Sequence, residues 1–378
     1  MSDTIRRALA AAGLDADAEC GPLKGVTATI QQALASAGIA PPPVEAARGA
    51  IIEGVAREVG PSAPIDAGGE PGAAMQPEPR GAFLDRCFDG NAGTRAYKVY
   101  LPMCYAEMSE ESLPLVVMLH GCTQSPADFA AGTRMNALAD QHRFVVVYPE
   151  QAGHANASRC WNWFRSEDQH RDRGEPSLLA GMTREVVAHY RIDARRVFVA
   201  GLSAGGAMAA ILAAVYPELF AAVGVHSGLP CGAAHDVASA FAAMRGVAGD
   251  VAARPAGRAV PEAATPEVPV IVFHGSADQT VDARNGAAIV ARAVGAHARF
   301  RPLQTSIHVS TPQDGRKYRR TVHADGTGRV LVEHWQLDGG GHAWSGGSPR
   351  GSFTDARGPD ASTEMIRFFF AQPRAGLA

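Results

Sequence analysis

One turn constrains the fold of this chain more than any other feature. Residues 197–200 form an apolar, β-type run, Gly201-Leu202-Ser203-Ala204-Gly205 follows it, and a run of small, helix-forming residues comes next. A serine in a Gly-x-Ser-x-Gly turn between a strand and a helix sits in strained backbone with its hydroxyl exposed. Glycines two residues either side let backbone pass where a Cβ would collide. The pattern predicts that Ser203 stands at a helix N-terminus, which stabilises negative charge.

The motif alone is weak evidence, because a chain with 41 glycines contains such matches by chance. Its context is more specific: β-branched residues precede the turn, and Ala-Met-Ala-Ala-Ile-Leu-Ala-Ala follows it. A strand–turn–helix context is what separates a nucleophile from a chance match. We therefore predict that Ser203 is a nucleophile that attacks a carbonyl carbon.

The remaining pattern places this turn in an α/β fold. From about residue 81, strand and helix patterns alternate, which is typical of a parallel sheet with crossover helices. We expect an α/β-hydrolase fold with a mostly parallel central sheet flanked by helices. Two stretches exceed ordinary connections and are predicted to be insertions that shape a pocket, 152–175 and 232–268. Strands are expected at 97–101, 113–119, 144–148, 197–201, 220–225, 269–273 and 330–337, and helices at 127–142, 176–190 and 359–370.

Three segments are expected along the chain. Residues 1–40 have apolar residues at helix-like spacing and are predicted to form an N-terminal helical extension, either an oligomerisation or regulatory helix or a tail without fixed structure. Residues 41–80 are rich in Pro, Gly and Ala and read as a linker without a core of its own. Residues 81–378 are predicted to form the catalytic domain.

Composition excludes several classes of partner. The chain has 46% hydrophobic and 19% charged residues and a net charge of -3, which fits a globular enzyme and gives no electrostatic case for nucleic acid or an anionic membrane. No apolar run is long enough to cross a bilayer, and the N-terminus lacks the apolar core of a signal peptide. We expect a cytoplasmic location, or secretion if a leader was trimmed. Oligomeric state is left open.

The six cysteines are scattered without metal-ligand spacing, and the 13 histidines form no His-x-x-x-His cluster. No metal and no cofactor are therefore expected, and a metal-dependent hydrolase is not supported. A cytoplasmic location predicts reduced thiols. Cys122 and Cys160 flank two motifs described below and can approach each other, so a disulfide between them stays open as the alternative.

A serine nucleophile needs a base and an orienting acid, which follow it in the order Ser, Asp or Glu, His in this fold. Asp278 lies in a glycine-containing loop directly after the apolar run 270–273, and we predict that it is the acid. Asp282 is the runner-up, although it is placed to stabilise the start of the next helix instead.

His342 is the predicted base, because it follows a strand and a triple-glycine loop that lets it reach the serine. His334 reads as a strand-face side chain and His274 as a residue that supports the acid or the core. His226 ends another strand and is the best spare. In the predicted mechanism, His342 accepts the proton of Ser203 as an acyl-enzyme forms, and Asp278 orients the imidazole.

An oxyanion hole completes this chemistry. One donor is expected to be the N–H of Ala204, and the other the N–H of Cys122 in the loop after the buried strand 113–119. Cysteine nucleophilicity is the rival use of Cys122, but no second histidine–acid set follows this loop. His120 is expected to anchor the loop through hydrogen bonds.

Together, the motifs resemble those of the polyhydroxybutyrate depolymerase family of esterases, over roughly residues 81–372. That family includes depolymerases of short-chain polyhydroxyalkanoates and feruloyl or acetylxylan esterases. The resemblance implies carboxylic-ester hydrolysis by Ser203, Asp278 and His342 without a metal. The motifs are Leu119-His120-Gly121-Cys122-Thr123-Gln124, Tyr148-Pro149-Glu150-Gln151, Cys160-Trp161-Asn162-Trp163-Phe164, Gly201-Leu202-Ser203-Ala204-Gly205-Gly206 and Gly341-His342-Ala343-Trp344.

The resemblance also implies a substrate cleft lined by aromatic residues, to which Trp161, Trp163 and Trp344 correspond, with His120 beside them. Secreted depolymerases of this kind carry a signal peptide and a polymer-binding domain, neither of which is visible here. Soluble 3-hydroxybutyrate oligomers or small esters are therefore the expected substrates, ahead of solid polyester. Feruloyl or acetylxylan esters and polyamide or peptide-like bonds are the alternatives. A non-enzymatic scaffold is disfavoured, because all three members of the triad are present.

Overall fold

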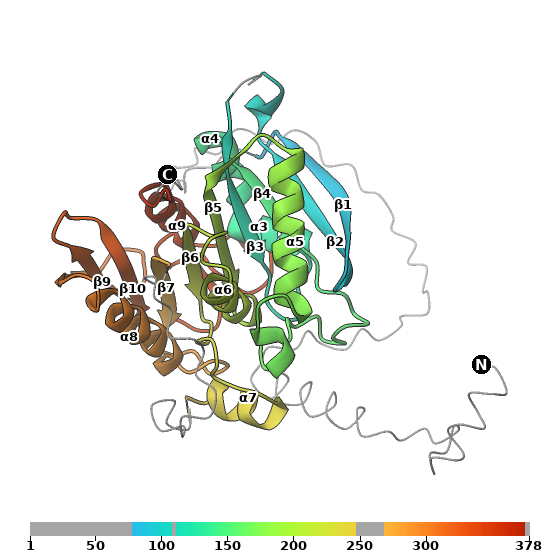
Figure 1. The fold of residues 1–378 in the computed structure, drawn as a ribbon. Helices are drawn as coiled ribbons and strands as arrows, with labels where there is room; N and C mark the ends of the chain where they lie inside the picture. The colour runs from blue at the N-terminus through green and yellow to red at the C-terminus, as the bar shows by residue number, and fades with distance from the viewer. Residues whose placement is uncertain (1–77, 108–110, 247–267, 375–378) are drawn as a thin grey trace, which may run out of the picture. The chain divides into compact units, whose positions relative to one another are not determined.

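A mixed sheet forms the centre of the molecule (Figure 1). The computed structural model describes residues 78–107, 111–246 and 268–374. The predicted helical extension, nearly all of the predicted linker and much of the second insertion lie outside these residues. Within them, ten strands pair in the order β1-β2-β4-β3-β5-β6-β7-β10-β9-β8.

Six neighbouring strands of this sheet are parallel, and the pairs at both ends are antiparallel. The mostly parallel sheet expected from the sequence is confirmed. The parallel strands are β4 (Val145–Pro149), β3 (Leu113–Leu119), β5 (Ile192–Leu202), β6 (Ala222–His226), β7 (Val270–Gly275) and β10 (Val330–Leu337). The antiparallel strands are β1 (Ala82–Gly90) and β2 (Gly93–Leu101) at one edge, and β8 (Leu303–Ser310) and β9 (Tyr318–Asp325) at the other.

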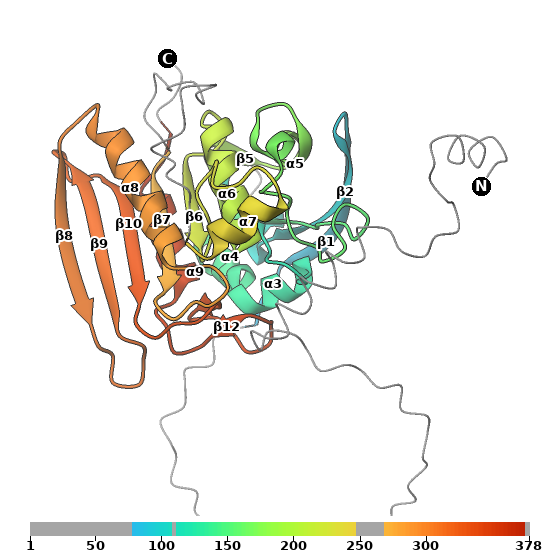
Figure 2. The same ribbon diagram turned by 90° about the horizontal axis from the view of Figure 1, so that it is seen from below.

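Helices cover both faces of the sheet, as Figure 2 shows. One face carries α5 (Gly174–His189), α6 (Ala204–Val215), α7 (Val237–Met244) and α8 (Arg284–Ala298). The other carries α3 (Pro126–Thr133), α4 (Met135–His142) and α9 (Ala361–Phe370). Shorter elements are the 3-10 helices η1 (Met103–Ala106) and η2 (Ser166–Gln169) and the strands β11 (Trp344–Ser345) and β12 (Thr354–Asp355).

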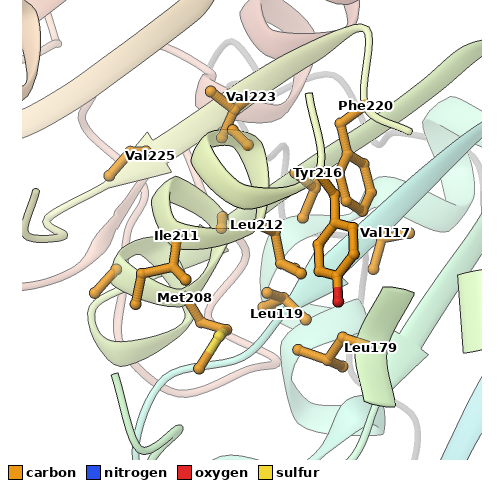
Figure 3. Close-up of a cluster of buried hydrophobic side chains, with 14 of the residues drawn as sticks. Val117, Leu119, Leu179, Met208, Ile211, Leu212, Tyr216, Phe220, Val223 and Val225 are labelled. Carbon is orange, nitrogen blue, oxygen red and sulfur yellow. The ribbon is translucent and has the colours of Figure 1, made fainter. Parts of the chain in front are cut away.

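The sheet divides the core into two apolar layers. Every residue of β3 and β4 is buried, which is why these strands read as continuous apolar runs in the sequence. In the layer drawn in Figure 3, Met208 and Leu212 of α6 pack among Leu119 of β3, Val225 of β6 and Leu179 of α5. The small residues at the start of α6 bring this helix close to the strands that carry the site.

The expected strands and helices are present, but the helix predicted at 127–142 is two helices. Arg134 adopts a left-handed conformation (φ 56°) that ends α3 and begins α4. Its guanidinium donates to the Gly346 carbonyl and to an Asp360 carboxylate oxygen, both at 2.7 Å. These partners are more than 200 positions away, so no local pattern indicated the break. Strands β1 and β8 at the two edges of the sheet, and β9 beside β8, were not predicted, because they lack a continuous apolar run.

Two glycines offer a matched test of this packing. A Cβ on Gly205 would overlap the carbonyl oxygen of Leu119, whereas a Cβ on Gly295 in α8 would meet nothing. Gly205→Ala is expected to lower the free energy of unfolding by about 3 kcal/mol or to prevent folding, because overpacking forces backbone apart. Gly295→Ala is expected to raise it by about 0.5–1 kcal/mol, because alanine favours a helix interior. Urea denaturation of both variants measures this, and equal stability of the two would contradict the packing described.

Candidate active site

The predicted nucleophile, acid and base all follow strands of the parallel part of the sheet. Ser203 follows β5, Asp278 follows β7 and His342 follows β10. The ends of these strands are in register, because Leu202 pairs with His226 of β6 and Gly275 pairs with Leu337. Carboxyl ends of adjacent parallel strands share one edge, which is where ligands bind in such sheets. The structure therefore brings the three loops to one edge.

Ser203 occupies the strained turn that the sequence predicts. Its backbone has φ 57° and ψ -119°, an unusual conformation for a residue with a side chain. The Ser203 N–H donates to the carbonyl of His226 at 2.9 Å, and the Ser203 carbonyl accepts from the N–H of Ala207 in α6. Gly201 lies against the backbone of Gly205 with no room for a Cβ on either residue. The elbow is thus locked between β5 and α6.

Asp278 and His342 form a buried hydrogen-bonded pair. His342 Nδ1 lies 2.8 Å from Asp278 Oδ2, while the other oxygen accepts from the N–H groups of Thr280 and Val281 at 2.9 and 2.8 Å. Burial opposes ionisation of this carboxyl, but the hydrogen bonds from His274 and His342 outweigh it and hold the pKa of Asp278 far below its usual value. A carboxylate there makes His342 Nδ1 the donor and leaves Nε2 free to accept a proton.

The acid loop and the base loop are joined directly. The N–H groups of Ser276 and Ala277 donate to the carbonyls of Leu337 and Gly340 at 2.8 and 2.9 Å. A Cβ on Gly275 would overlap the Gly340 carbonyl, so the close approach requires glycine at this position. These contacts explain how His342 can lie on a glycine-rich loop and still keep one orientation toward Asp278.

The other candidates have different partners. Asp282 pairs with the guanidinium of Arg284 at 2.9 Å and does not contact His342. His274 contacts Asp278 at 3.5 Å and its Nε2 donates to the Val281 carbonyl, so it supports the acid. His334 is buried on β10.

His226 connects the elbow to the loop that carries the base. Its carbonyl accepts from Ser203, and its ring Nε2 accepts from the N–H of Ser345 at 3.0 Å. The ring also stacks on Trp344. Burial lowers the pKa of His226 to about 3, so it is a neutral acceptor at neutral pH. His226 therefore has a structural role: it holds the backbone of the serine elbow and of the loop that carries His342.

The loop between β3 and α3 presents the predicted oxyanion donor. The N–H groups on either side of Cys122 are in use: Gly121 donates to Gln124 Oε1 at 2.9 Å, and Thr123 donates to the Ser158 carbonyl at 2.8 Å. Within the described part of the chain, the Cys122 N–H has no acceptor. A Cβ on Gly205 would also collide with the His120 carbonyl, so the start of α6, with Ala204, lies against this loop.

His120 is fully buried and anchors the loop, as expected from the sequence. Its Nδ1 lies 2.8 Å from the Gly121 carbonyl, and its Nε2 accepts from the N–H of Gln151 at 3.1 Å. Burial lowers the pKa of His120 to about 4, so it stays neutral and keeps one donor and one acceptor.

The three tryptophans expected in a substrate cleft have their side chains in the interior. Trp161 donates from Nε1 to the His120 carbonyl at 3.1 Å, and Trp344 donates to Ser362 Oγ at 3.0 Å. Trp163 packs edge-on against Phe164. All three contribute to the packing beneath the site, and contact of these indoles or of His120 with substrate stays a prediction.

Cys122 and Cys160 form a disulfide, which corrects the expectation of reduced thiols at these positions. The bond joins the loop after β3 to the first long insertion, in which residues 152–165 form no helix or strand. Cys87 is an exposed free thiol. Reduced cysteines were expected only because a cytoplasmic location was expected, whereas the pairing depends on the contact between two loops that are distant in sequence.

Three polar residues around this loop were missed as site residues: Gln151, Asn162 and Glu175. Two of them lie inside the motifs that carry the family resemblance, which was the available signal. Glu175 precedes a proline at a helix start, where an acidic residue ordinarily complements the helix dipole at the surface. Nothing local indicated that its carboxylate is buried.

Neither a metal site nor a membrane-spanning helix is found among the described residues. Within residues 78–107, 111–246 and 268–374, no group of His, Cys, Asp or Glu side chains converges to suit a metal ion. Across the same ranges, no helix combines the length and apolar character needed to cross a bilayer.

Comparison with known proteins decides the family. A family model described as Esterase PHB depolymerase matches residues 95–298, more than half of the chain. The chain belongs to this family. The matched span includes Ser203, Asp278 and the loops that carry Cys122 and Cys160, whereas β10 and the loop with His342 lie after it.

Individual relatives include more than one kind of esterase. Poly(3-hydroxyalkanoate) depolymerase C of Paucimonas lemoignei is 35% identical over 236 residues, which are 61% of this chain and 54% of that protein. This chain thus spans about half the length of that relative. A probable acetylxylan esterase A of Neosartorya fischeri is 28% identical over 273 residues, 68% of this chain and 72% of that protein.

A solved structure agrees on the fold. The acetyl xylan esterase from Aspergillus awamori superposes with a TM-score of 0.59 at 20% identity, covering 77% of this chain and all of that one. The predicted α/β-hydrolase fold is confirmed.

The disulfide is expected to stabilise the folded state. It closes a segment of 38 positions, for which the chain-entropy model gives roughly 4 kcal/mol. A Cys122→Ala/Cys160→Ala double variant is expected to lose about that much unfolding free energy in urea denaturation. Cys87→Ala, which removes an exposed free thiol, is the control and should unfold like the parent. If dithiothreitol and the double variant both leave the midpoint unchanged, the pairing is wrong.

Proposed function

We propose that this chain hydrolyses carboxylic esters through an acyl-enzyme on Ser203. The observation that carries the proposal is one sheet edge that holds a strained serine elbow together with a buried, hydrogen-bonded Asp278–His342 pair. Strain at a non-glycine residue persists where the surroundings impose it, as at active sites. Membership of an esterase family supports the same reaction.

In the proposed mechanism, His342 Nε2 takes the proton of Ser203 Oγ as this oxygen attacks the ester carbonyl. Asp278 accepts from His342 Nδ1 and stabilises the imidazolium that forms. His342 then protonates the leaving alcohol, and water repeats the cycle on the acyl-enzyme. Negative charge on the tetrahedral intermediate is stabilised by the N–H groups of Cys122 and Ala204.

For the substrate, we propose short-chain 3-hydroxyalkanoate oligomers or the corresponding polyester. The identity to a poly(3-hydroxyalkanoate) depolymerase supports this class. An acetylated or feruloylated sugar ester is the second candidate, because a probable acetylxylan esterase aligns over more of its own length. Both classes present an ester carbonyl to the same serine, so the mechanism does not discriminate between them.

The Cys122–Cys160 disulfide also bears on location. Structural disulfides persist in oxidising compartments and are rare in the cytosol. We therefore propose that the chain works in an oxidising compartment, in place of the cytoplasmic location expected from composition.

A substrate panel tests the function. Purified protein is expected to hydrolyse 3-hydroxybutyrate dimer and trimer faster than methyl ferulate or acetylated xylose, as measured by released acid. Ser203→Ala is expected to lower kcat by about 10³-fold or more on every substrate, because no other nucleophile replaces it. Substantial hydrolysis by Ser203→Ala would overturn the mechanism. A preference for acetylated xylose or methyl ferulate would replace only the substrate class.

Asp278→Asn and Asp282→Asn form a matched pair that tests the acid. Asp278→Asn is expected to lower kcat for p-nitrophenyl butyrate by about 10³–10⁴-fold, because an amide reverses the hydrogen bond that sets the His342 tautomer. Asp282→Asn loses only a surface ion pair and should keep kcat within about twofold. Comparable losses in both variants would mean that Asp278 has no special role.

A further inference from the structure

We propose that Glu175 is a positioning residue for the oxyanion hole: its buried carboxylate holds residues 151–162 in place, and these residues hold the Cys122 N–H. The inference rests on the proposed function, because it assumes that the Cys122 N–H stabilises a tetrahedral intermediate on Ser203. Glu175 itself contacts no reacting atom and acts through the loop.

Glu175 lies in the first turn of α5 and is only 5% exposed. Its Oε1 accepts from the side-chain amides of Gln151 at 2.5 Å and Asn162 at 2.7 Å, and its Oε2 accepts from the Asn162 N–H at 2.7 Å. Arg95 lies 3.8 Å away and supplies a positive charge. Both oxygens are therefore committed to residues of one loop.

These partners are unusual for an acidic residue at a helix start. A carboxylate in a first turn ordinarily faces solvent near the helix N–H groups, where it complements the dipole. Here the donors come from a separate segment, residues 151–165, which has no helix or strand of its own. Because a buried carboxylate is costly unless fully hydrogen-bonded, each donor is held firmly. The carboxylate thus supplies hydrogen bonds that fix this loop, which lacks the regular backbone hydrogen bonds of a helix or a strand.

From this loop, hydrogen bonds run directly to the oxyanion loop. The Gln151 N–H donates to His120 Nε2 at 3.1 Å, and the Gln151 side chain also donates to the Cys160 carbonyl at 2.9 Å. Next in the chain, Trp161 Nε1 donates to the His120 carbonyl at 3.1 Å. The Cys122–Cys160 disulfide makes the covalent link. Two of these hydrogen bonds end on His120, one ends on the carbonyl of Cys160, and the disulfide ends on Cys122 itself. All of them therefore restrain the segment that carries the Cys122 N–H.

Oxyanion stabilisation depends on the position of the donor. A donor must lie close to the place where charge develops, and a misplacement of about 1 Å can cost on the order of 10² in rate. Substrate binding in the ground state is less sensitive, since the carbonyl is not yet charged. A defect in Glu175 should therefore lower kcat much more than it changes KM.

Glu175→Gln is the sharpest variant, because it keeps the shape of the side chain and replaces one acceptor oxygen by an N–H donor that faces another donor. Both oxygens of Glu175 face N–H donors, so the amide nitrogen of glutamine must face one of them in either orientation. Glu185→Gln is the control: it lies on the same helix, and its partner is the hydroxyl of Tyr97. With p-nitrophenyl butyrate, Glu175→Gln is expected to lower kcat about 10–100-fold with KM within about threefold. Glu185→Gln should match the parent.

A second measurement separates positioning from loss of folded protein. An alkylboronic acid accepts an electron pair from Ser203 Oγ, the serine proton passes to His342, and a tetrahedral boronate anion forms that needs the oxyanion hole. Its inhibition constant should rise by about the same factor as kcat falls in Glu175→Gln. Loss of folded protein would lower the apparent kcat but leave this constant and KM unchanged, and the thermal midpoint shows whether the variant is folded. Trp161→Phe removes one hydrogen bond of the same path and should show a smaller loss of the same kind.

The outcomes are distinct. Folded Glu175→Gln with unchanged kcat and unchanged boronate inhibition overturns the positioning role. If Glu175→Gln does not fold, Trp161→Phe decides: a parallel loss in kcat and boronate affinity supports the proposal, and parent values for both reject it. Failure of the proposed function has its own signature, namely ester hydrolysis that survives Ser203→Ala.

Discussion

The direction shared by neighbouring strands is the constraint on which this site depends. Because β5, β6, β7 and β10 are parallel and in register, the loops that follow them leave the sheet at one edge. Residues separated by 75 and 64 positions, Ser203 to Asp278 and Asp278 to His342, are brought to that edge by the pairing of these strands. Reversing any one of these strands would move its loop to the opposite edge.

Close backbone approach converts this shared edge into a site with defined geometry. At Gly201 and Gly205 the start of α6 touches β5 and the end of β3, and at Gly275 the acid loop touches the base loop. No side chain fits at these contacts. The site is therefore assembled from rigid backbone, and the side chains proposed to be catalytic project from turns whose conformations leave few alternatives.

Buried polar groups hold the irregular loops in place, as backbone hydrogen bonds between neighbouring strands hold the sheet. His226 connects the serine elbow to Ser345, His120 connects the loop after β3 to Gln151, and Glu175 holds Gln151 and Asn162. Burial keeps both histidines neutral at neutral pH, so each acts as a fixed acceptor. Irregular segments near a reacting group need such partners, because unsatisfied buried backbone groups are costly.

The sequence alone determined the buried parallel strands and the Ser203 elbow, and it predicted an acid and a base after them, because each follows from a local pattern: an apolar run, a glycine spacing, a loop after a strand. It ranked Asp278 ahead of Asp282 without showing which of them contacts His342, allowed two states for Cys122 and Cys160, joined α3 to α4, and passed over β1, β8, β9 and Glu175. Only the tertiary structure decided these, since each depends on partners distant in sequence, such as Asp360 for Arg134 and Asn162 for Glu175. A local sequence pattern indicates which residues are buried and which form turns. Contacts between loops that are distant in sequence arise only when the sheet has formed.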